Sequence, residues 1–356
     1  MIWCERRDSN PHAVRRWNLN PVRLPIPPLS HRFFDGDFTA IPTPPRGQQR
    51  FFIDSQRSKR VVFTNIICHF RQLHPCRSAR LVPVPVNHYE NFPVASWLLP
   101  SHLRAPIEAI YAFARSADDF ADEGQLSDAE RIGLLSGYER ELDFIESGTL
   151  STAGLFINLA ATIAKHQLPI QPFRDLLSAF RQDVTKTRYA NFEEVMDYCR
   201  RSADPIGRLL LHLNGQATPQ NLAWSDSICS ALQLINHWQD VAIDWRKNEG
   251  GRVYLPLDDL TRFGLSERDI ADQSRSGAWR KMMSFECDRA RKLLQRGAPL
   301  GRALSGRMGA ELRAMIAGGS AILDKIDAVD GDVFRHRPTL SKWDWFKIGP
   351  RALISL

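Results

Sequence analysis

Apolar residues recur at helical spacing from Asn87 to the end of the chain, in long segments that short runs of Gly, Pro and Ser interrupt. Alternating runs of β-branched residues are essentially absent, and the short stretch at residues 82–86 is interrupted by prolines. The pattern therefore predicts a single all-α domain over residues 87–356. Its predicted helices are roughly 102–122, 127–147, 152–166, 171–187, 192–213, 219–245, 266–273, 277–296, 300–326 and 341–355.

The first 80 residues have a different composition. They hold nine of the 22 prolines and show little apolar periodicity, which is typical of a disordered chain. They lack both the amphipathic pattern of a transit peptide and the apolar core of a signal peptide. We therefore predict that residues 1–86 are a disordered leader, and we favour a bacterial start codon assigned too far upstream. Because the next Met is Met196, inside the domain, the true start would be a Val or Leu codon such as Val61 or Val82.

The net charge of +7 comes from this leader. Residues 1–80 carry 14 Lys and Arg against 5 Asp and Glu, whereas the remaining residues carry 33 against 35. A nucleic-acid-binding function would depend on the leader alone. The sequence therefore predicts neither a basic groove in the domain nor a nucleic-acid partner.

The cysteine pattern and the hydropathy indicate in which compartment of the cell the protein is expected. Six cysteines are scattered without a Cys-x-x-Cys pair, which favours a reducing compartment, and no window of about 18 apolar residues would span a membrane. We expect a bacterial cytoplasmic protein. Four apolar residues near the C-terminus either pack on the bundle, which is the favoured interpretation, or form an amphipathic surface that contacts the inner membrane peripherally. They are Trp343, Trp345, Phe346 and Ile348.

Residues 108–124 carry the first candidate site. On a helix, five of their side chains share one face: Tyr111, Arg115, Asp118, Asp119 and Asp122. A solvent-exposed helix end is the alternative. Two features oppose it, because the helix dipole disfavours acids at a C-terminal end and because these acids follow an apolar stretch. Asp118 and Asp122, at i and i+4, can point their oxygens into one space suited to Mg²⁺.

Residues 231–245 carry the second candidate site. Four polar residues form a stripe with spacings of 3, 4 and 4 on an otherwise apolar helix: Gln233, Asn236, Asp240 and Asp244. Buried carboxylates need compensating partners, so this helix and the first are expected to face each other across a cavity. His237 lies off the stripe and is interpreted as a packing residue. The loop that follows brings Arg252 and Tyr254 near the stripe, and the Arg fork suits phosphate oxygens, although an ordinary loop Arg is the alternative.

Residues 87–345 resemble the squalene and phytoene synthase family. Its members combine an aspartate-rich first motif, an Asn/Asp second motif and a following Gly-Arg-x-Tyr-Leu-Pro, here residues 251–256. Residues 87–93, 233–240 and 340–345 resemble in particular the branch that forms hydroxysqualene in bacterial hopanoid biosynthesis. The resemblance implies an isoprenoid-synthase helical bundle with a central cavity.

The resemblance also implies roles for individual residues. The ligands of Mg²⁺ would be Asp118, Asp119, Asp122, Asn236, Asp240 and Asp244. The groups that contact diphosphate would be His88, Arg115 and Arg252. The other residues of the cavity would be Phe92, Tyr111, Tyr198, Gln233 and Tyr254, of which the aromatic ones could stabilise a carbocation through cation–π attraction.

Two departures from the family pattern narrow the substrate. Gln239 and Glu90 each stand where condensing members of the family have a cation. A substrate with one diphosphate needs fewer cations than two prenyl diphosphates do. We therefore hypothesise that presqualene diphosphate, which is already condensed, reacts with water to give hydroxysqualene and diphosphate, while Mg²⁺ and the arginines stabilise the leaving group. The sequence assigns no residue to position the water.

This hypothesis implies a prenyl diphosphate substrate that a presqualene diphosphate synthase supplies and a product that a hydroxysqualene reductase consumes. The sequence has no Gly-x-Gly-x-x-Gly fingerprint after a strand, which fits a separate reductase. One alternative is a squalene or phytoene synthase that condenses two prenyl diphosphates. Another is a non-catalytic assembly or scaffold relative, although such a protein would be expected to have lost the carboxylates that this chain retains.

Overall fold

A computed structural model of the chain describes residues 101–122, 126–149, 154–247, 251–335, 337–341, 343–346 and 348–349. All of them belong to the second of two units, Pro85–Leu356. The predicted leader and the candidate site residues His88 and Phe92 lie outside the described residues, as does Glu90. Asp122 ends a described helix, but its side chain is outside the description.

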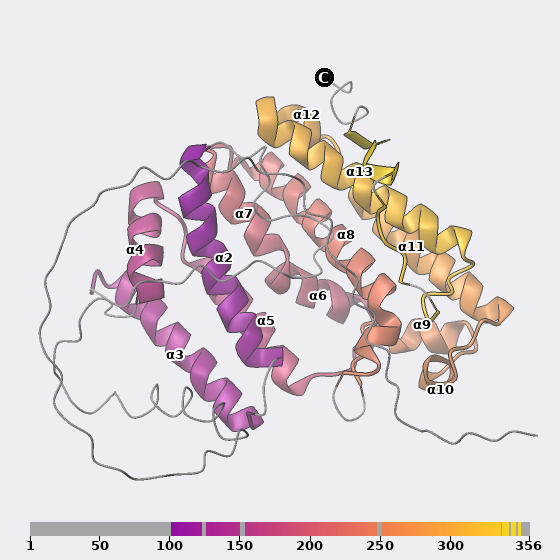
Figure 1. Ribbon diagram of the computed structural model, residues 1–356. Coiled ribbons are helices and arrows are strands. Elements are labelled where there is room, and N and C mark those ends of the chain that lie inside the picture. The colour runs from indigo at the N-terminus through magenta and orange to yellow at the C-terminus, as the bar shows by residue number, and fades with distance from the viewer. Residues whose placement is uncertain are drawn as a thin grey trace, which may run out of the picture. The chain divides into compact units, whose positions relative to one another are not determined.

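The described residues confirm the predicted all-α fold. Outside the helices, their pairing of strand type is limited to one isolated bridge between Arg188 and Val253. The helices, shown in Figure 1, are α2 (Ser101–Asp122), α3 (Asp128–Glu146), α4 (Gly154–His166), α5 (Gln171–Thr185), α6 (Phe192–Ser202), α7 (Asp204–Leu213), α8 (Pro219–Asp244), α9 (Leu257–Arg262), α10 (Glu267–Ala271), α11 (Gly277–Gly297), α12 (Leu300–Ala303) and α13 (Gly306–Ala328).

Two helix predictions were wrong in detail, and one short helix was missed. The predicted helix 192–213 is two helices, because Pro205 has no N–H to donate to the preceding turn and α7 begins afresh beside it. The predicted helix 300–326 breaks at Leu304, whose backbone is extended (ψ 123°), before Gly306 at a φ of +66°. The short α9 was missed. Within the prediction at 341–355, the described residues 343–346 and 348–349 are helical, and residues 350–355 lie outside the description.

Two apolar clusters hold the bundle together. Residues of α2, α3, α4 and α5 form one cluster, in which Phe113 contacts Phe173 edge to face at 5.3 Å between ring centroids. Residues of α8, α11 and α13 belong to the other, which contains the fully buried Trp238 and Trp279. Figure 1 shows α8 between α7 and α11, the two helices on which it packs most extensively. The polar stripe of α8 therefore runs along a helix that is enclosed by others.

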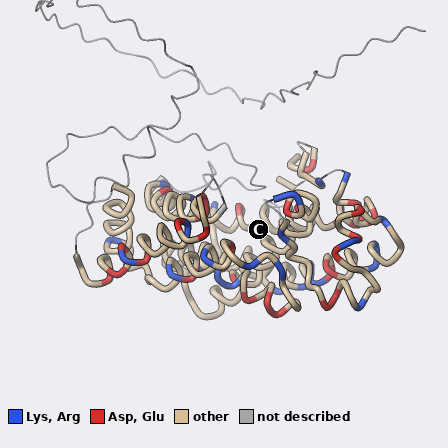
Figure 2. The backbone as a smooth tube through the Cα atoms, turned by 90° about the horizontal axis from the view of Figure 1, so that it is seen from below, with Lys and Arg blue, Asp and Glu red and all other residues tan. Residues whose placement is uncertain are grey.

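The charged positions of the bundle are mixed in sign. Figure 2 shows Lys and Arg interspersed with Asp and Glu along the helices. These helices therefore give no support to a nucleic-acid-binding face.

No helix in the described part of the chain is both long enough and apolar enough to cross a membrane.

The described residues near the C-terminus are partly packed and partly exposed. Ile348 is buried, and Asp344 forms an ion pair with Lys325 of α13 at 2.9 Å. Trp343 and Phe346 are 75% and 72% exposed, and their rings contact each other. These helical residues near the C-terminus are thus tied to the bundle while two aromatic rings remain on the surface.

Candidate active site

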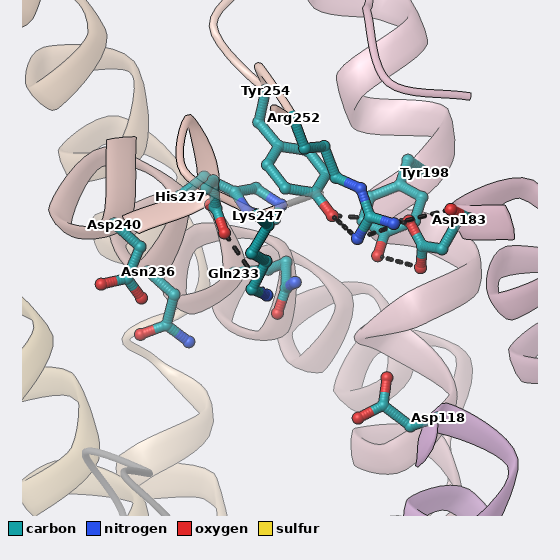
Figure 3. Close-up of a pocket in the computed structure, with 11 residues that line it drawn as sticks. Asp118, Asp183, Tyr198, Gln233, Asn236, His237, Asp240, Lys247, Arg252 and Tyr254 are labelled. Carbon is teal, nitrogen blue, oxygen red and sulfur yellow. Dashed lines mark hydrogen bonds and ion pairs between the residues drawn. The ribbon is translucent and has the colours of Figure 1, made fainter. Parts of the chain in front are cut away.

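A polar cavity of about 210 Å³ lies at the stripe of α8. Figure 3 shows residues that line it, with Asp118 of α2 on a different side from Asn236 and Asp240 of α8. Eight sequence-predicted residues meet in this cavity: Asp118, Tyr198, Gln233, Asn236, Asp240, Asp244, Arg252 and Tyr254. The expectation that carboxylates from the two motifs border one cavity therefore agrees with the structure.

The turn after α8 delivers Arg252 to the cavity. Gly251 has a φ of +63°, and a Cβ atom on it would lie 2.2 Å from the carbonyl oxygen of Trp245. Only glycine fits that approach without displacing the backbone. The next residue, Arg252, donates its backbone N–H to the Asp244 carbonyl oxygen at 2.8 Å and so caps the helix end.

Arg252 belongs to a buried network centred on Asp183 of α5. The Arg252 guanidinium donates to the Asp183 backbone oxygen at 2.6 Å and lies 3.6 Å from its carboxylate. The Tyr198 hydroxyl donates to the same carboxylate at 2.7 Å, and the Tyr254 hydroxyl lies 3.4 Å from it. Burial raises the pKa of both tyrosines well above the usual value. The two phenols therefore stay protonated.

His237 occupies the wall of the same cavity. Its ring stacks on Tyr254, with 3.6 Å between centroids and 14° between planes, so the packing role predicted for it is observed. It also lines the cavity, which the sequence did not indicate. Burial, and then the charges of Arg252 and Lys247, lower the pKa of His237 to about 3. The imidazole is consequently neutral at physiological pH.

Each carboxylate of the cavity has a cation as its partner. Asp118 pairs with Arg115 at 3.1 Å, and the same guanidinium reaches Asp119 at 2.6 Å. Asp244 faces Lys247 at 3.5 Å. The carboxylates are thus compensated by protein side chains, as buried or half-buried charges require.

Asp240 has its cation from the C-terminal segment. The Arg337 guanidinium contacts both carboxylate oxygens, with Nε on Oδ1 and Nη2 at 3.0 Å from Oδ2. Next to this pair, the buried Gln239 donates its side-chain N–H to the Pro338 carbonyl oxygen. Position 239 carries no cation, but Arg337 brings one to this site from a distant segment. The site therefore does not lack a cation as the sequence had indicated.

Several predicted residues lie elsewhere. Within the described chain, Tyr111, Arg115 and Asp119 are not among the residues that line this cavity, although Arg115 holds Asp118 in place. Sequence reasoning missed Asp183, Lys247 and Arg337. For Asp183 a signal existed, because it continues the buried stripe of α5 formed by Phe173, Leu176 and Phe180.

The donor set suits a hard cation, but it is not a closed metal site. Carboxylate and amide oxygens are the ligands that Mg²⁺ prefers. Burial raises the pKa of Asp244 to about 6, Asp240 adds to the shift, and Lys247 opposes it. A further cation near Asp240 and Asp244 would relieve that electrostatic penalty. Among the described residues, however, no three acidic, His or Cys side chains form a ready group of ligands.

Comparison with known proteins identifies the family. The family model for squalene/phytoene synthase matches residues 86–344. A hydroxysqualene synthase from Rhodopseudomonas palustris is 38% identical over 242 residues, which are 68% of this chain and 80% of that protein. A phytoene synthase from Arthrospira platensis is 30% identical over 73% of this chain and 87% of its own length.

A solved structure gives the same result. The crystal structure of a squalene synthase from Alicyclobacillus acidocaldarius shares 38% identity and a TM-score of 0.63, over 68% of this chain and 90% of that one. A dehydrosqualene synthase structure, at 20% identity and a TM-score of 0.64, shares the fold. The chain is therefore an enzyme of the squalene/phytoene synthase family.

Proposed function

We propose that this enzyme converts presqualene diphosphate and water to hydroxysqualene and diphosphate. The observation that carries the proposal is the order of similarity among relatives. Hydroxysqualene synthases from three bacteria are 35–38% identical to the chain, whereas five phytoene synthases are 29–33% identical. The proposed reaction needs one diphosphate to ionise, one carbocation to be sheltered and one water molecule to be admitted.

The cavity is suited to the diphosphate end of such a substrate. Its volume of about 210 Å³ is below the ~300–1,000 Å³ of sites that enclose a drug-sized ligand, so the hydrocarbon chains would extend beyond it. Arg252 and Lys247 provide cationic groups on its wall. As the carbon–oxygen bond breaks, its electron pair leaves with the diphosphate, and these cations would stabilise the growing negative charge.

Magnesium fits the donor set described above, and Asp118, Asn236, Asp240 and Asp244 would hold it. The metal would supply Lewis-acid stabilisation of the leaving diphosphate. For Asp240 to be a ligand, its carboxylate would have to give up the Arg337 guanidinium, wholly or in part. The guanidinium that is released would then be available to diphosphate oxygens.

Aromatic rings would shelter the carbocation. Tyr198 and Tyr254 line the cavity with ring centroids 5.5 Å apart, and such faces attract cations. Because burial raises the pKa of both phenols, neither is a phenolate that could trap the cation. Water then forms the new carbon–oxygen bond and releases a proton, which the departing diphosphate accepts.

A condensing activity on two prenyl diphosphates is the second candidate. The position of Arg337 favours it, because this residue supplies a cation beside Asp240 that the sequence had seemed to lack. The two candidates are separated by substrate. We would incubate the purified protein and Mg²⁺ with presqualene diphosphate or with farnesyl diphosphate, each with and without NADPH, and identify the products by mass spectrometry.

The proposal expects hydroxysqualene from presqualene diphosphate and no thirty-carbon product from farnesyl diphosphate alone. Removal of Mg²⁺ with EDTA should abolish turnover. Asp118→Asn and Asp240→Asn should each lower turnover by about a hundredfold or more, whereas Asp226→Asn, at an ion pair with Arg208 outside the cavity lining, should not. Undiminished turnover in both cavity variants would refute the proposed roles of these carboxylates.

The reaction also implies partners. A presqualene diphosphate synthase would supply the substrate, and a reductase would carry hydroxysqualene to squalene on the route to hopanoids.

The exposed aromatic rings near the C-terminus suggest a membrane contact. Both substrate and product are lipids, and we propose that the exposed rings of Trp343 and Phe346 contact the bilayer surface. The double variant Trp343→Ser/Phe346→Ser should co-sediment less with phosphatidylglycerol vesicles, whereas Ile157→Ser, which removes an exposed apolar side chain of α4, should not. Equal sedimentation of all three proteins would refute this contact.

A further inference from the structure

The His237 imidazole is held rigidly at the cavity. Its side chain is 5% exposed, and its ring is stacked on Tyr254 with 3.6 Å between centroids. Tyr198 lies beside both rings, at 5.9 Å from the His237 ring. Tyr254 therefore covers one face of the His237 ring, and the nitrogens at the ring edge remain for polar contacts.

One of those nitrogens lacks a protein partner. Among the described residues, Nε2 of His237 is buried and makes no hydrogen bond. A buried polar atom without a partner costs about 1–3 kcal/mol, so such atoms in folded proteins commonly face water or a ligand. His237 also lines a polar cavity, where a water molecule can find the two to four partners that it requires. Nε2 itself is covered in this structure, so a water molecule bound to it requires a small shift of the neighbouring side chains.

Several other polar groups that line the cavity are engaged. Tyr198 and Tyr254 direct their hydroxyls to Asp183. The carboxylates of Asp240 and Asp244 face Arg337 and Lys247. In the tautomer with its proton on Nδ1, His237 offers through Nε2 an uncharged acceptor. An acceptor of this kind can hold a water molecule beside a carbocation without itself forming a bond to carbon.

We propose that His237 orients the water molecule that captures the carbocation. The inference rests on the proposed function, since only a reaction that ends in an alcohol needs this water. Nε2 would accept a hydrogen bond from the water and leave an oxygen lone pair directed at the cationic carbon. That lone pair forms the carbon–oxygen bond of hydroxysqualene. The proton that is lost goes to the diphosphate, which left earlier with the electron pair of the broken bond.

The test measures the fate of the cation as well as the rate. His237→Phe keeps an aromatic ring against Tyr254 and removes the acceptor, whereas His237→Gln retains an acceptor without the ring. With presqualene diphosphate in H₂¹⁸O, each protein would be assayed for diphosphate release and for the product mixture by mass spectrometry. His212→Phe, on α7 and outside the cavity lining, serves as the matched control.

For His237→Phe we expect diphosphate release to continue while the hydroxysqualene fraction falls about tenfold or more, in favour of elimination or rearranged products. His237→Gln should recover part of the ¹⁸O-labelled alcohol, and His212→Phe should match the parent enzyme. An unchanged product ratio in His237→Phe would overturn the inference, and so would a parallel loss of ionisation and alcohol in a folded variant. If His237→Phe does not fold, His237→Gln and His237→Leu decide the question, because equal ratios in these two would also overturn it. Failure of the parent enzyme to form hydroxysqualene would instead refute the proposed function.

Discussion

The pair between Arg337 and Asp240 leads to a measurable prediction about metal binding. Coordination of a metal by both oxygens of Asp240 requires the guanidinium to move, because it now contacts both oxygens. The replacement Arg337→Gln removes this competitor and leaves the carboxylate in place. The metal-free variant should therefore bind a divalent cation more tightly than the parent protein, because it has lost both the competitor for Asp240 and a positive charge that repels the metal.

The size of the effect follows from the burial of the pair. The side chains of Arg337 and Asp240 are 18% and 23% exposed, so the pair is neither fully exposed nor fully buried. An exposed ion pair contributes ~0–1 kcal/mol to stability, and a buried hydrogen bond to a charged group contributes ~1.5–3 kcal/mol. We take about 1–2 kcal/mol for the pair. At about 1.4 kcal/mol per factor of ten, removing the competitor should tighten cation binding by roughly 5- to 30-fold.

The assay is a titration with Mn²⁺, used as a spectroscopic probe for Mg²⁺ and followed by electron paramagnetic resonance, without substrate. Arg335→Gln is the control, since Arg335 pairs with Asp332 at 3.7 Å and its side chain is 58% exposed. The control should leave the affinity unchanged. Equal or weaker Mn²⁺ binding by Arg337→Gln would refute the idea that the guanidinium competes with the metal.

Three further changes test other parts of the site. Because burial raises the pKa of Asp244 to about 6, the folded state holds that proton more tightly than the unfolded state, and this carboxyl makes stability fall as pH rises from about 4 to 6. Asp244→Asn should therefore raise the unfolding free energy of the metal-free protein at pH 8 by up to about 3 kcal/mol. The variant should also lose less stability between pH 4 and pH 6. Urea titrations that show no difference between variant and parent would contradict this. Asp183→Asn removes the counter-charge of the buried Arg252 and should cost about 3–5 kcal/mol of unfolding free energy, whereas a change below about 1 kcal/mol would contradict the network. Gly251→Ala should destabilise the protein by more than Gly264→Ala does. Gly264 has a similar φ of +69° but open space around an added Cβ, so its replacement should cost only about 1–2 kcal/mol. Equal losses of stability would show that the close approach to Trp245 does not matter.

The fold and half of the site followed from local patterns. The spacing of Gln233, Asn236, Asp240 and Asp244 predicted a polar stripe on one helix, and the stripe borders a cavity as expected. This worked because helical periodicity is a local property of the chain. The prediction of one helix over 192–213 was wrong because apolar spacing outweighed the local signal of Pro205.

The remaining half of the site depends on contacts between distant segments. Arg337 meets Asp240 across 97 positions of sequence, and no periodicity joins the two. His237 was interpreted from its place off the polar stripe, yet a helix that is buried on several sides has more than one face that can border a cavity. Asp183 was different, because an acid on the apolar face of α5 was visible in the sequence and only its partner, Arg252, required the fold.

The near balance of charge in the cavity has a consequence for the catalytic cycle. Among the described residues, five carboxylates in or next to the cavity pair with four cations, Arg115, Lys247, Arg252 and Arg337. The carboxylates are those of Asp118, Asp119, Asp183, Asp240 and Asp244. A cavity of this kind exerts only a weak long-range field, so substrate encounter should depend little on ionic strength. At the end of a turnover, the side chains that release metal and diphosphate can form their ion pairs with one another again. The carboxylates are then not left without a counter-charge, and the re-formation of these ion pairs favours release of the inorganic product.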